Sequence, residues 1–449
     1  MQDNAGGSAP LGQAARGGTP DAVRYEGARL IVGDGRQVVE QGAILVRNGL
    51  IEGIGPQDDV ASVPGEHTVS LHGRTVIPAL INPHGHIGYW KGAGADAAHF
   101  SAANVLDHLR RLAYHGVGVF QSLGTDRDDT EIRLRDLQRR GALDEDDLAV
   151  LFSAGSGIVA PTPESSNGGP FFAVDAVHEA SGPEDARGHV RALAAKKADA
   201  VKFWLDDRHG TKARLRPDVY RAIIEEAHAH GLKTAAHIYT VDDAKEAVRA
   251  GADILAHLPR TPEPDAELLD LLTTRDVVVF TSMSIQRPDG EAWLDDPALR
   301  ELVADEAVAE LRARIRRNAP QPLFDTVDAY ARMEKTLRTF VDAGVRVVFS
   351  ADTGLLTQVP GFAEHRELEA LVAAGLPPLT VIQLATQRSA ELLGLGDRGT
   401  LEAGKRADFV VLDADPLVDI THSRRIESVY LQGRRVDRAR LRARVWSDQ

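Results

Sequence analysis

Short apolar runs alternate with longer amphipathic segments through the middle of the chain. Eight runs of strand length lie between residues 76 and 352, separated by segments of helix length. This alternation predicts parallel strands linked by helices, and eight such units predict a (β/α)8 TIM barrel. The expected strands are 76–86, 116–125, 148–157, 200–206, 234–240, 253–258, 277–284 and 346–352.

Glycine follows several of the amphipathic segments. The residue just past a helix end often takes a left-handed conformation, which glycine adopts without steric cost. The pattern therefore predicts helix ends at Gly116, Gly141, Gly231, Gly251 and Gly344.

Two stretches of the barrel region are too long for ordinary loops between a strand and a helix. The first, 158–183, is rich in proline and glycine and is a candidate lid or substrate loop. The second, 297–344, precedes the last strand and has a helical pattern.

Both ends of the chain carry short β-type patterns. Asn48-Gly49 lies between two apolar runs, which is the strongest short-range signal for a β-hairpin. Matching runs at 407–413 and 426–436 predict that the two flanks meet in one small β-sandwich. We expect a sandwich domain from 22–76 and 398–449, a barrel domain at 77–397, and a disordered lead-in at 1–21.

Charge and composition narrow the function classes. The formal net charge of -14, without any Lys/Arg-rich block, argues against a nucleic-acid partner. No apolar run is long enough to cross a membrane, so we expect a soluble protein. The absence of cysteine removes disulfides, thiolate nucleophiles and cysteine-bound metals. Cytoplasmic location and export after loss of a signal peptide both stay open.

Residue types that bind metals gather at the predicted carboxyl ends of the barrel strands. Residues i and i+2 of a strand point the same way, so the first strand aims two imidazoles at one point. Each residue alone is explained as well or better by a hydrogen-bonding or capping role. Their joint placement favours a shared metal site, at the end of the barrel where active sites lie. The set is His84, His86, Lys202, His237, His257 and Asp352.

These residues and their flanking text resemble the metal-dependent amidohydrolase superfamily, and within it the binuclear members with a carboxylated lysine. The stretch 399–412, Gly-Thr-Leu-Glu-Ala-Gly-Lys-Arg-Ala-Asp-Phe-Val-Val-Leu, followed by Asp415-Pro416, is typical of that superfamily. The texts Lys-Phe-Trp-Leu and His-Ile-Tyr-Thr, beginning at Lys202 and His237, are most similar to the prolidase-like and imidazolonepropionase-related branch. The resemblance covers nearly the whole chain.

The resemblance implies two divalent metal ions. Zinc is the first expectation, with iron or manganese as alternatives, because imidazole binds all of them. A buried lysine loses affinity for its proton, which frees the amine to react with CO₂ and form a carbamate ligand. The implied ligands are His84, His86 and Asp352 for one ion, His237 and His257 for the other, and carboxylated Lys202 as the bridge.

The resemblance also implies catalytic roles. Two metal ions lower the pKa of a bridging water, and Asp352 would accept its proton and pass it to the leaving group. Tyr239, two residues after the fifth-strand histidine, would bind or polarise the substrate. The chain departs from the superfamily pattern at Asn82, usually aspartate, at Ala79, usually glycine, and at Leu258, but no ligand is missing.

Other residues near these strand ends are candidates for binding a substrate. Tyr89 and Trp90 follow the histidine pair and would wall the pocket. Arg208 and Arg260 lie just beyond the fourth and sixth strands, where either could clamp a carboxylate, although a surface charge explains each slightly better. His365 could reach the mouth of the site or serve equally well as a polar residue at a helix start.

We expect the chain to hydrolyse an amide or peptide-like C–N bond in a small molecule, such as an N-acyl amino acid or a dipeptide. Hydrolysis of a lactone or ester on the same site is one alternative. An iron-dependent enzyme that uses oxygen is another, and a non-catalytic relative is disfavoured because the ligand set is complete. Barrels of this type often pair, so a homo-oligomer stays open as well.

Overall fold

The computed structural model describes residues 22–143, 145–162, 172–208, 210–288, 290–318 and 327–447. The lead-in expected at 1–21 lies outside these residues, as do 163–171 of the candidate lid and 319–326 of the second long stretch. Within the described part, one large apolar cluster joins the central strands to the helices around them, and a smaller one fills the sheet formed by the two ends.

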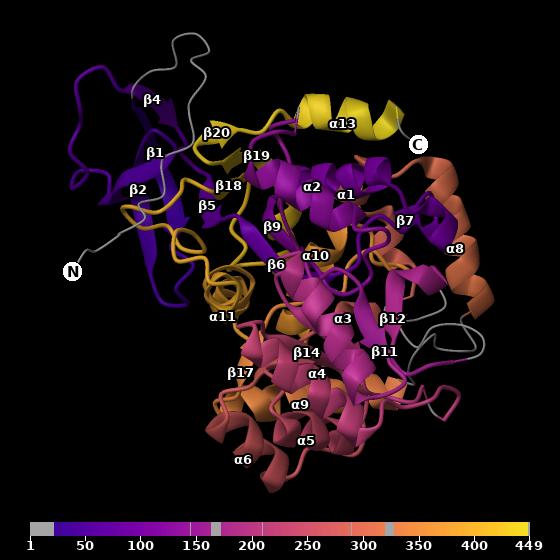
Figure 1. The fold of residues 1–449 in the computed structure, drawn as a ribbon. Helices are drawn as coiled ribbons and strands as arrows, with labels where there is room; N and C mark the ends of the chain where they lie inside the picture. Colours follow the sequence, from indigo (N-terminus) through magenta and orange to yellow (C-terminus); the bar gives the residue numbers. More distant parts are fainter. Residues whose placement is uncertain are drawn as a thin grey trace, which may run out of the picture.

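An eight-stranded sheet combines the two ends of the described chain. Figure 1 shows its indigo strands β1 and β2 near the yellow strands β18, β19 and β20. At the predicted hairpin, Asn48 and Gly49 have φ angles of 51° and 79°, as a tight turn between twisted strands requires. The spatial order is β20 (Arg434–Arg435), β19 (Ile426–Leu431), β18 (Phe409–Leu412), β5 (Thr75–Pro78), β1 (Val23–Ile31), β2 (Val38–Arg47) and β3 (Leu50–Pro56), with β4 (His67–Ser70) on β1.

The first expected barrel strand is in fact two short strands that belong to different sheets. β5 pairs with β18 and β1 in the terminal sheet, whereas β6 (Leu80–Gly85) pairs with β9 (Val117–Ser122) in the centre. Between them the Ala79 N–H donates to the Asp408 carbonyl and the Leu80 N–H to the Gly116 carbonyl. The apolar run is continuous because both sheets bury it, so hydrophobicity alone gave no sign of the break.

The other expected strand positions all carry parallel strands within the described residues. One sheet has the order β10 (Val150–Ser153), β9, β6; the second has the order β12 (Val177–Glu179), β11 (Gly157–Val159), β13 (Val201–Trp204), β14 (Thr234–His237), β15 (Ile254–Ala256), β16 (Val278–Phe280) and β17 (Arg346–Val348).

A few backbone contacts join these two sheets. Gly85 forms a parallel bridge with Thr353, just beyond β17. On the other side, the Asp199 N–H before β13 donates to the Ser153 carbonyl at the end of β10, at 2.9 Å. The result is a TIM-barrel-like α/β arrangement, in which the carboxyl ends of the strands face the same way.

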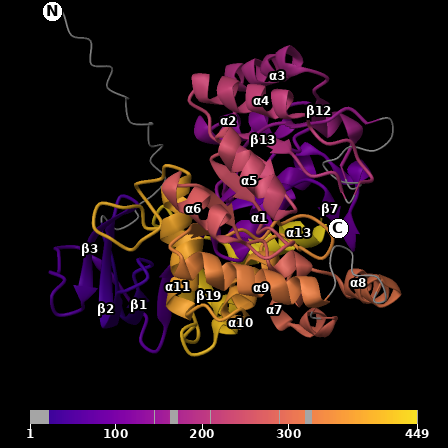
Figure 2. The same cartoon turned by 90° about the horizontal axis from the view of Figure 1, so that it is seen from below.

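Helices pack outside the central strands. All the predicted glycine ends are found, with φ angles between 63° and 102°. Helices α3 and α4 lie side by side, and so do α5 and α6 (Figures 1 and 2). The helices are α1 (Ala102–Tyr114), α2 (Thr130–Arg139), α3 (Pro183–Ala195), α4 (Pro217–Ala229), α5 (Val241–Ala250), α6 (Ala266–Thr274), α7 (Pro297–Arg300), α8 (Asp305–Asn318), α9 (Val327–Asp342), α10 (Phe362–Ala373), α11 (Pro378–Gln383), α12 (Ser389–Leu392) and α13 (Arg438–Ser447).

The two long stretches carry secondary structure of their own. In the first, β12 pairs in parallel with β11 and so extends the central sheet. The second forms α7, α8 and α9, as its helical pattern predicted. No helix in the described ranges combines the length and the apolar character that crossing a membrane requires.

Candidate metal centre

The first and last central strands bring two histidines and an aspartate together. His84 and His86 lie on and just after β6, and the His86 N–H donates to the Thr353 carbonyl at 2.7 Å. Asp352 precedes that threonine and has a φ angle of 50°, an uncommon conformation for a residue other than glycine. Position 354, just after Thr353, must be glycine, because a Cβ on Gly354 would overlap the carbonyl oxygen of His86. The junction between the strands is therefore tightly constrained.

The distances within this group fit a metal ion. Nε2 of His84 lies 3.4 Å from Oδ1 of Asp352, and Nε2 of His86 lies 3.3 Å from the same oxygen. Ligands about 2.0–2.2 Å from a tetrahedral zinc ion are separated from one another by about 3.3–3.5 Å. Ligand atoms of His84, His257 and Asp352 all lie within 4.8 Å of one another. The residues present therefore fit a bound metal ion without rearrangement.

A second pair of histidines lies beside the first. His237 ends β14, and His257 follows β15 with a φ angle of 107°. Nδ1 of His237 and Nε2 of His257 are 3.0 Å apart, so these two ring nitrogens converge. The rings of His84 and His257 are also close, with their centroids 5.2 Å apart. The four strand-end histidines thus form one continuous cluster.

Several buried polar atoms of this cluster have no hydrogen-bond partner within the described part of the chain. They include Nε2 of His84 and of His237, Nδ1 of His257 and Oδ1 of Asp352. A buried polar atom left without a partner costs about 1–3 kcal/mol. Unpaired buried atoms on metal-binding side chains are expected of a site that receives a ligand.

The opposite ring nitrogens of the first pair are held by hydroxyl groups. Nδ1 of His84 lies 3.0 Å from Oγ of Ser350, and Nδ1 of His86 lies 2.9 Å from Oγ1 of Thr125. These contacts turn Nε2 of both rings toward Asp352. Sequence reasoning missed both hydroxyls. Ser350, two residues before Asp352 on the same strand, could have been found from the period of two, but Thr125 could not.

Burial sets the charge of these side chains. It lowers the pKa of His84, His237 and His257 well below the ordinary value, and it also lowers the pKa of His86. The rings are therefore neutral, which is the form that binds a metal. Burial alone raises the pKa of Asp352, but the neighbouring rings of His84 and His86 outweigh it and lower that pKa below its ordinary value. The carboxylate remains ionised.

Lys202 lies in β13 and is almost completely buried. Burial lowers the pKa of its amine to about 7, although Asp352 raises it in part. The aliphatic stem fits closely against the backbone, because a Cβ on Gly124 would overlap Cβ and Cγ of the lysine. Nζ lies 5.0 Å from the centre of the Trp204 ring. A substantial fraction of this amine is neutral near pH 7 and chemically able to add CO₂.

Asp206 is a residue of this site that the sequence interpretation did not single out. Its carboxylate is buried, and Oδ2 lies 3.4 Å from Nε2 of His237. A signal existed, because Lys202, Trp204 and Asp206 share one side of an extended segment. The run ends in two acids, Asp206 and Asp207, and this alternation of positions points to the first of them.

The two arginines proposed to bind a carboxylate both affect the histidine cluster. After burial, Arg208 and Arg260 are among the charges that lower the pKa of His237. Nε of Arg208 lies 3.6 Å from Oδ1 of Asp206. The Arg260 guanidinium lies 5.0 Å from the centre of the Tyr239 ring, and the backbone N–H of Arg260 donates to the Tyr239 carbonyl. Arg208 therefore lies beside Asp206, and Arg260 lies beside Tyr239.

Tyr89 lies behind the histidine pair rather than open to the site. It is fully buried, its hydroxyl donates to the Thr125 carbonyl at 2.7 Å, and its ring packs against Phe172 and Phe100. Phe172 lies closer to the site, with its ring centroid 4.9 Å from that of His86. Phe172 therefore takes the position in which Tyr89 was expected.

The side chains of Trp90 and His365 make packing and hydrogen-bond contacts within the fold. Trp90 packs in a separate apolar cluster with residues of α7 and α8. Both ring nitrogens of His365 are engaged, one with Oγ of Ser423 and the other with the His115 carbonyl, each at 2.9 Å. His365 lies in the first part of α10, in line with its alternative as a polar residue near a helix start, and neither side chain is retained as a substrate contact.

Comparison with known proteins shows the family of the chain. The sequence matches the amidohydrolase family over residues 75–436. It is 24% identical to ochratoxinase of Aspergillus niger over 429 residues, covering 87% of this chain and 81% of that protein. It is also 24% identical to imidazolonepropionase of Deinococcus radiodurans over 406 residues, covering 88% of this chain and 92% of that protein.

A solved structure described as a putative prolidase from Bifidobacterium longum shares the fold. The TM-score is 0.72 at 23% identity, with 95% of this chain and 98% of that chain covered. These similarities are in the direction that the strand-end residues predicted, toward the imidazolonepropionase-related and prolidase-like branch. The chain belongs to the amidohydrolase family.

Proposed function

We propose that the chain is a metal-dependent hydrolase that cleaves an amide or peptide-like C–N bond in a small molecule. Family membership and the names of its relatives, ochratoxinase and imidazolonepropionase, support hydrolysis of C–N bonds. The observation that carries the metal requirement is the pair of distances, 3.4 and 3.3 Å, from Nε2 of His84 and of His86 to one oxygen of Asp352.

Two divalent ions, zinc first and iron or manganese as alternatives, would occupy the cluster. When bound, they would lower the pKa of a water molecule and polarise the carbonyl under attack. The short Nδ1–Nε2 distance in the second histidine pair and the depressed pKa of Lys202 support the second ion and the carbamate. The ligands would be His84, His86 and Asp352 for one ion, His237 and His257 for the other, and carboxylated Lys202 between them.

Residues of the chain itself would bind the substrate and move the proton. Asp352, ionised and buried, accepts the proton of the attacking water and delivers it to the leaving nitrogen. Arg208 and Arg260 bind a carboxylate on the substrate, which favours N-acyl amino acids and dipeptides. Tyr239, held against Arg260, contacts the substrate carbonyl.

The proposal also includes how the barrel closes and how the two chain ends pack. We infer a closed (β/α)8 barrel over 77–397 and a β-sandwich formed by 22–76 and 398–449. The bridge between Gly85 and Thr353 supports closure, because it joins the first strand to the last. Closure matters for function, since it holds the ligands of the first and eighth strands at a fixed distance.

A matched pair of substrates tests the carboxylate preference. An N-acyl amino acid and its C-terminal amide differ only in that carboxylate, and the wild-type enzyme should prefer the acid by about 30-fold or more in kcat/KM. Arg260→Met or Arg208→Met should reduce this preference, whereas Arg216→Met, on the exposed surface, should not. If both site variants keep the full preference, the arginines do not bind the carboxylate. Cleavage of lactones but of no amide would favour the ester alternative.

A further inference from the structure

Behind the metal centre, Asn82, Thr353 and Glu364 form a fully buried hydrogen-bonded group, here called the Asn82 triad. Nδ2 of Asn82 donates to Oγ1 of Thr353 at 3.1 Å and to Oε1 of Glu364 at 2.8 Å. Oγ1 of Thr353 donates to the same Glu364 oxygen at 2.6 Å. The three side chains come from β6, from the segment after β17 and from α10.

The direction of these hydrogen bonds is fixed by a backbone group. The His84 N–H, which can only donate, points at Oδ1 of Asn82 at 3.1 Å. The amide nitrogen of Asn82 must therefore face Glu364, whose carboxylate can only accept. An aspartate at position 82 would still accept from His84, but it would turn a second oxygen toward Oε1 of Glu364. The amide at position 82 and the acid at position 364 thus depend on each other.

The triad connects the two parts of the metal centre. Asn82 lies two residues before His84, and Thr353 directly follows Asp352. The backbone of Thr353 also contacts the first strand, through its bridge to Gly85 and the hydrogen bond from His86. Glu364 is the only described side chain that contacts both Asn82 and Thr353 through one oxygen atom. It therefore ties the segment bearing the histidines to the segment bearing the aspartate.

We propose that Glu364 is a positioning residue for the metal centre, which sets the distance between the His84/His86 pair and Asp352 through Asn82 and Thr353. The residue acts through its neighbours and does not touch the metal or the substrate. This inference rests on the proposed function, since it assumes that the cluster binds a metal. Residues that orient metal ligands change metal affinity by about 10- to 100-fold when they are altered.

A reciprocal exchange of polarity tests the proposal. Asn82→Asp alone places two acids face to face and should weaken zinc binding by about tenfold or more. The double variant Asn82→Asp/Glu364→Gln restores one acceptor and one donor with their positions exchanged. It should recover zinc affinity to within about threefold of the wild type. Affinity is measured on the full chain, stripped of metal and titrated with Zn²⁺ against a chromophoric chelator.

Two further variants separate positioning from general stability. Glu367→Gln is the matched control, because Glu367 lies on the same helix and is equally buried, but it accepts from the backbone N–H groups of Met283 and Ser284. It should lower the melting temperature and leave zinc affinity within about threefold. Thr353→Val removes one hydroxyl with little change in shape, so it remains informative if Asn82→Asp does not fold. It should weaken zinc binding by about tenfold.

The outcomes distinguish this inference from the proposed function. A wild-type chain that binds no zinc, iron or manganese contradicts the proposed function itself. A wild-type chain that binds zinc, with Asn82→Asp or Thr353→Val binding it equally well, contradicts the positioning role alone. A double variant no tighter than Asn82→Asp does the same, because it shows that the two residues act independently.

Discussion

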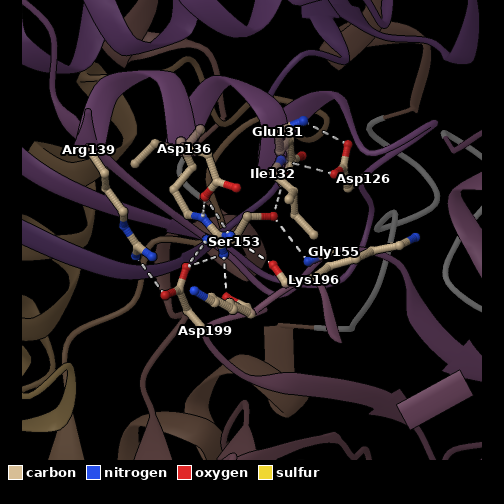
Figure 3. A network of polar contacts seen from close by, with 12 residues as sticks. Asp126, Glu131, Ile132, Asp136, Arg139, Ser153, Gly155, Lys196 and Asp199 are labelled. Atoms are coloured by element: carbon tan, nitrogen blue, oxygen red, sulfur yellow. Dashed lines mark hydrogen bonds and ion pairs between the residues drawn. The ribbon is translucent and has the colours of Figure 1, made fainter. Parts of the chain in front are cut away.

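Two of the buried polar clusters in the described part of this protein differ in how completely their atoms are paired. The first, here called the Asp199 network, links α2 to β9, β10 and the start of β13 (Figure 3). Glu131 accepts from the hydroxyls of Ser122 and Ser153, and Asp199 accepts from the Ser153 N–H and from Arg135. In the second, the metal centre, four ligand-type atoms have no hydrogen-bond partner in the described chain.

The difference between the clusters separates a structural role from a functional one. A fully paired network recovers the cost of burying polar groups and fixes the positions of the strands it joins. In an equally buried cluster without such pairing, the free-energy cost of burying the polar groups is not recovered. Interactions elsewhere in the fold must therefore hold the cluster in place. Substitutions in the Asp199 network should therefore change stability, whereas substitutions in the metal centre should change activity and metal binding.

The largest expected effect is on turnover, at Asp352. Asp352→Asn keeps the shape of the side chain and removes its ability to accept a proton. We expect kcat to fall by about 10²–10⁴-fold, with the melting temperature of the metal-free protein unchanged or raised, because a buried charge is lost. Steady-state kinetics and thermal unfolding on the same preparation measure both. A variant that turns over normally would remove Asp352 from the mechanism.

The second-largest expected effect is at Glu131, where we expect a loss of stability without a loss of turnover. Glu131→Ala leaves the hydroxyls of Ser122 and Ser153 without their acceptor, which should lower the free energy of unfolding by about 2–5 kcal/mol. Activity per folded molecule should stay within about threefold of the wild type. Glu131→Gln, which keeps one acceptor, should have a smaller effect in chemical denaturation. If Glu131→Ala abolishes turnover while remaining fully folded, the division between the two clusters fails.

A third effect concerns added metal. Zinc that binds only the folded protein should raise the free energy of unfolding by about 2.7 kcal/mol at a concentration 100 times its dissociation constant. Thermal unfolding with and without zinc should show this increase for the wild type and for Glu131→Gln. His84→Ala should lose most of it. Equal stabilisation of His84→Ala would place the zinc elsewhere.

The smallest effect is a pH dependence in the Asp199 region. Burial raises the pKa of Asp126 to about 6, against the backbone hydrogen bonds it accepts from Glu131 and Ile132. The folded state then holds a proton that the unfolded state has released, so stability falls as pH rises from about 4 to about 6, by up to about 1.4 kcal/mol per pH unit. Asp126→Asn should flatten this slope in denaturation curves, and an unchanged slope would assign it to another group.

Most of the fold could be predicted from the sequence, because each central strand is a short apolar run between glycine-ended helices. The split of the first strand between two sheets could not, since both sheets bury the same continuous apolar run. Hairpin geometry was predictable from Asn48-Gly49, where local backbone conformation decides the outcome. Hydrophobic pattern thus predicts which residues are buried, but not which sheet buries them.

The convergence of the strand-end histidines with Asp352 was also predictable, because barrel geometry brings the carboxyl ends of strands together. The residues that hold them were not. Thr125 and Glu364 lie on other elements, and only tertiary packing brings them to His86 and Asn82. Trp90 was expected in the pocket because it follows His86 closely, but closeness in sequence to a ligand does not determine which way a side chain points.

The most direct test of this account is the metal content of the full-length protein, purified without added metal, beside Lys202→Ala and the surface control Lys196→Ala. Elemental analysis should find about two metal ions per chain in the wild type and in Lys196→Ala. Lys202→Ala should retain markedly less, because it removes the group proposed to bridge them. A single metal ion per chain, unaffected by Lys202→Ala, would contradict the carbamate-bridged binuclear centre.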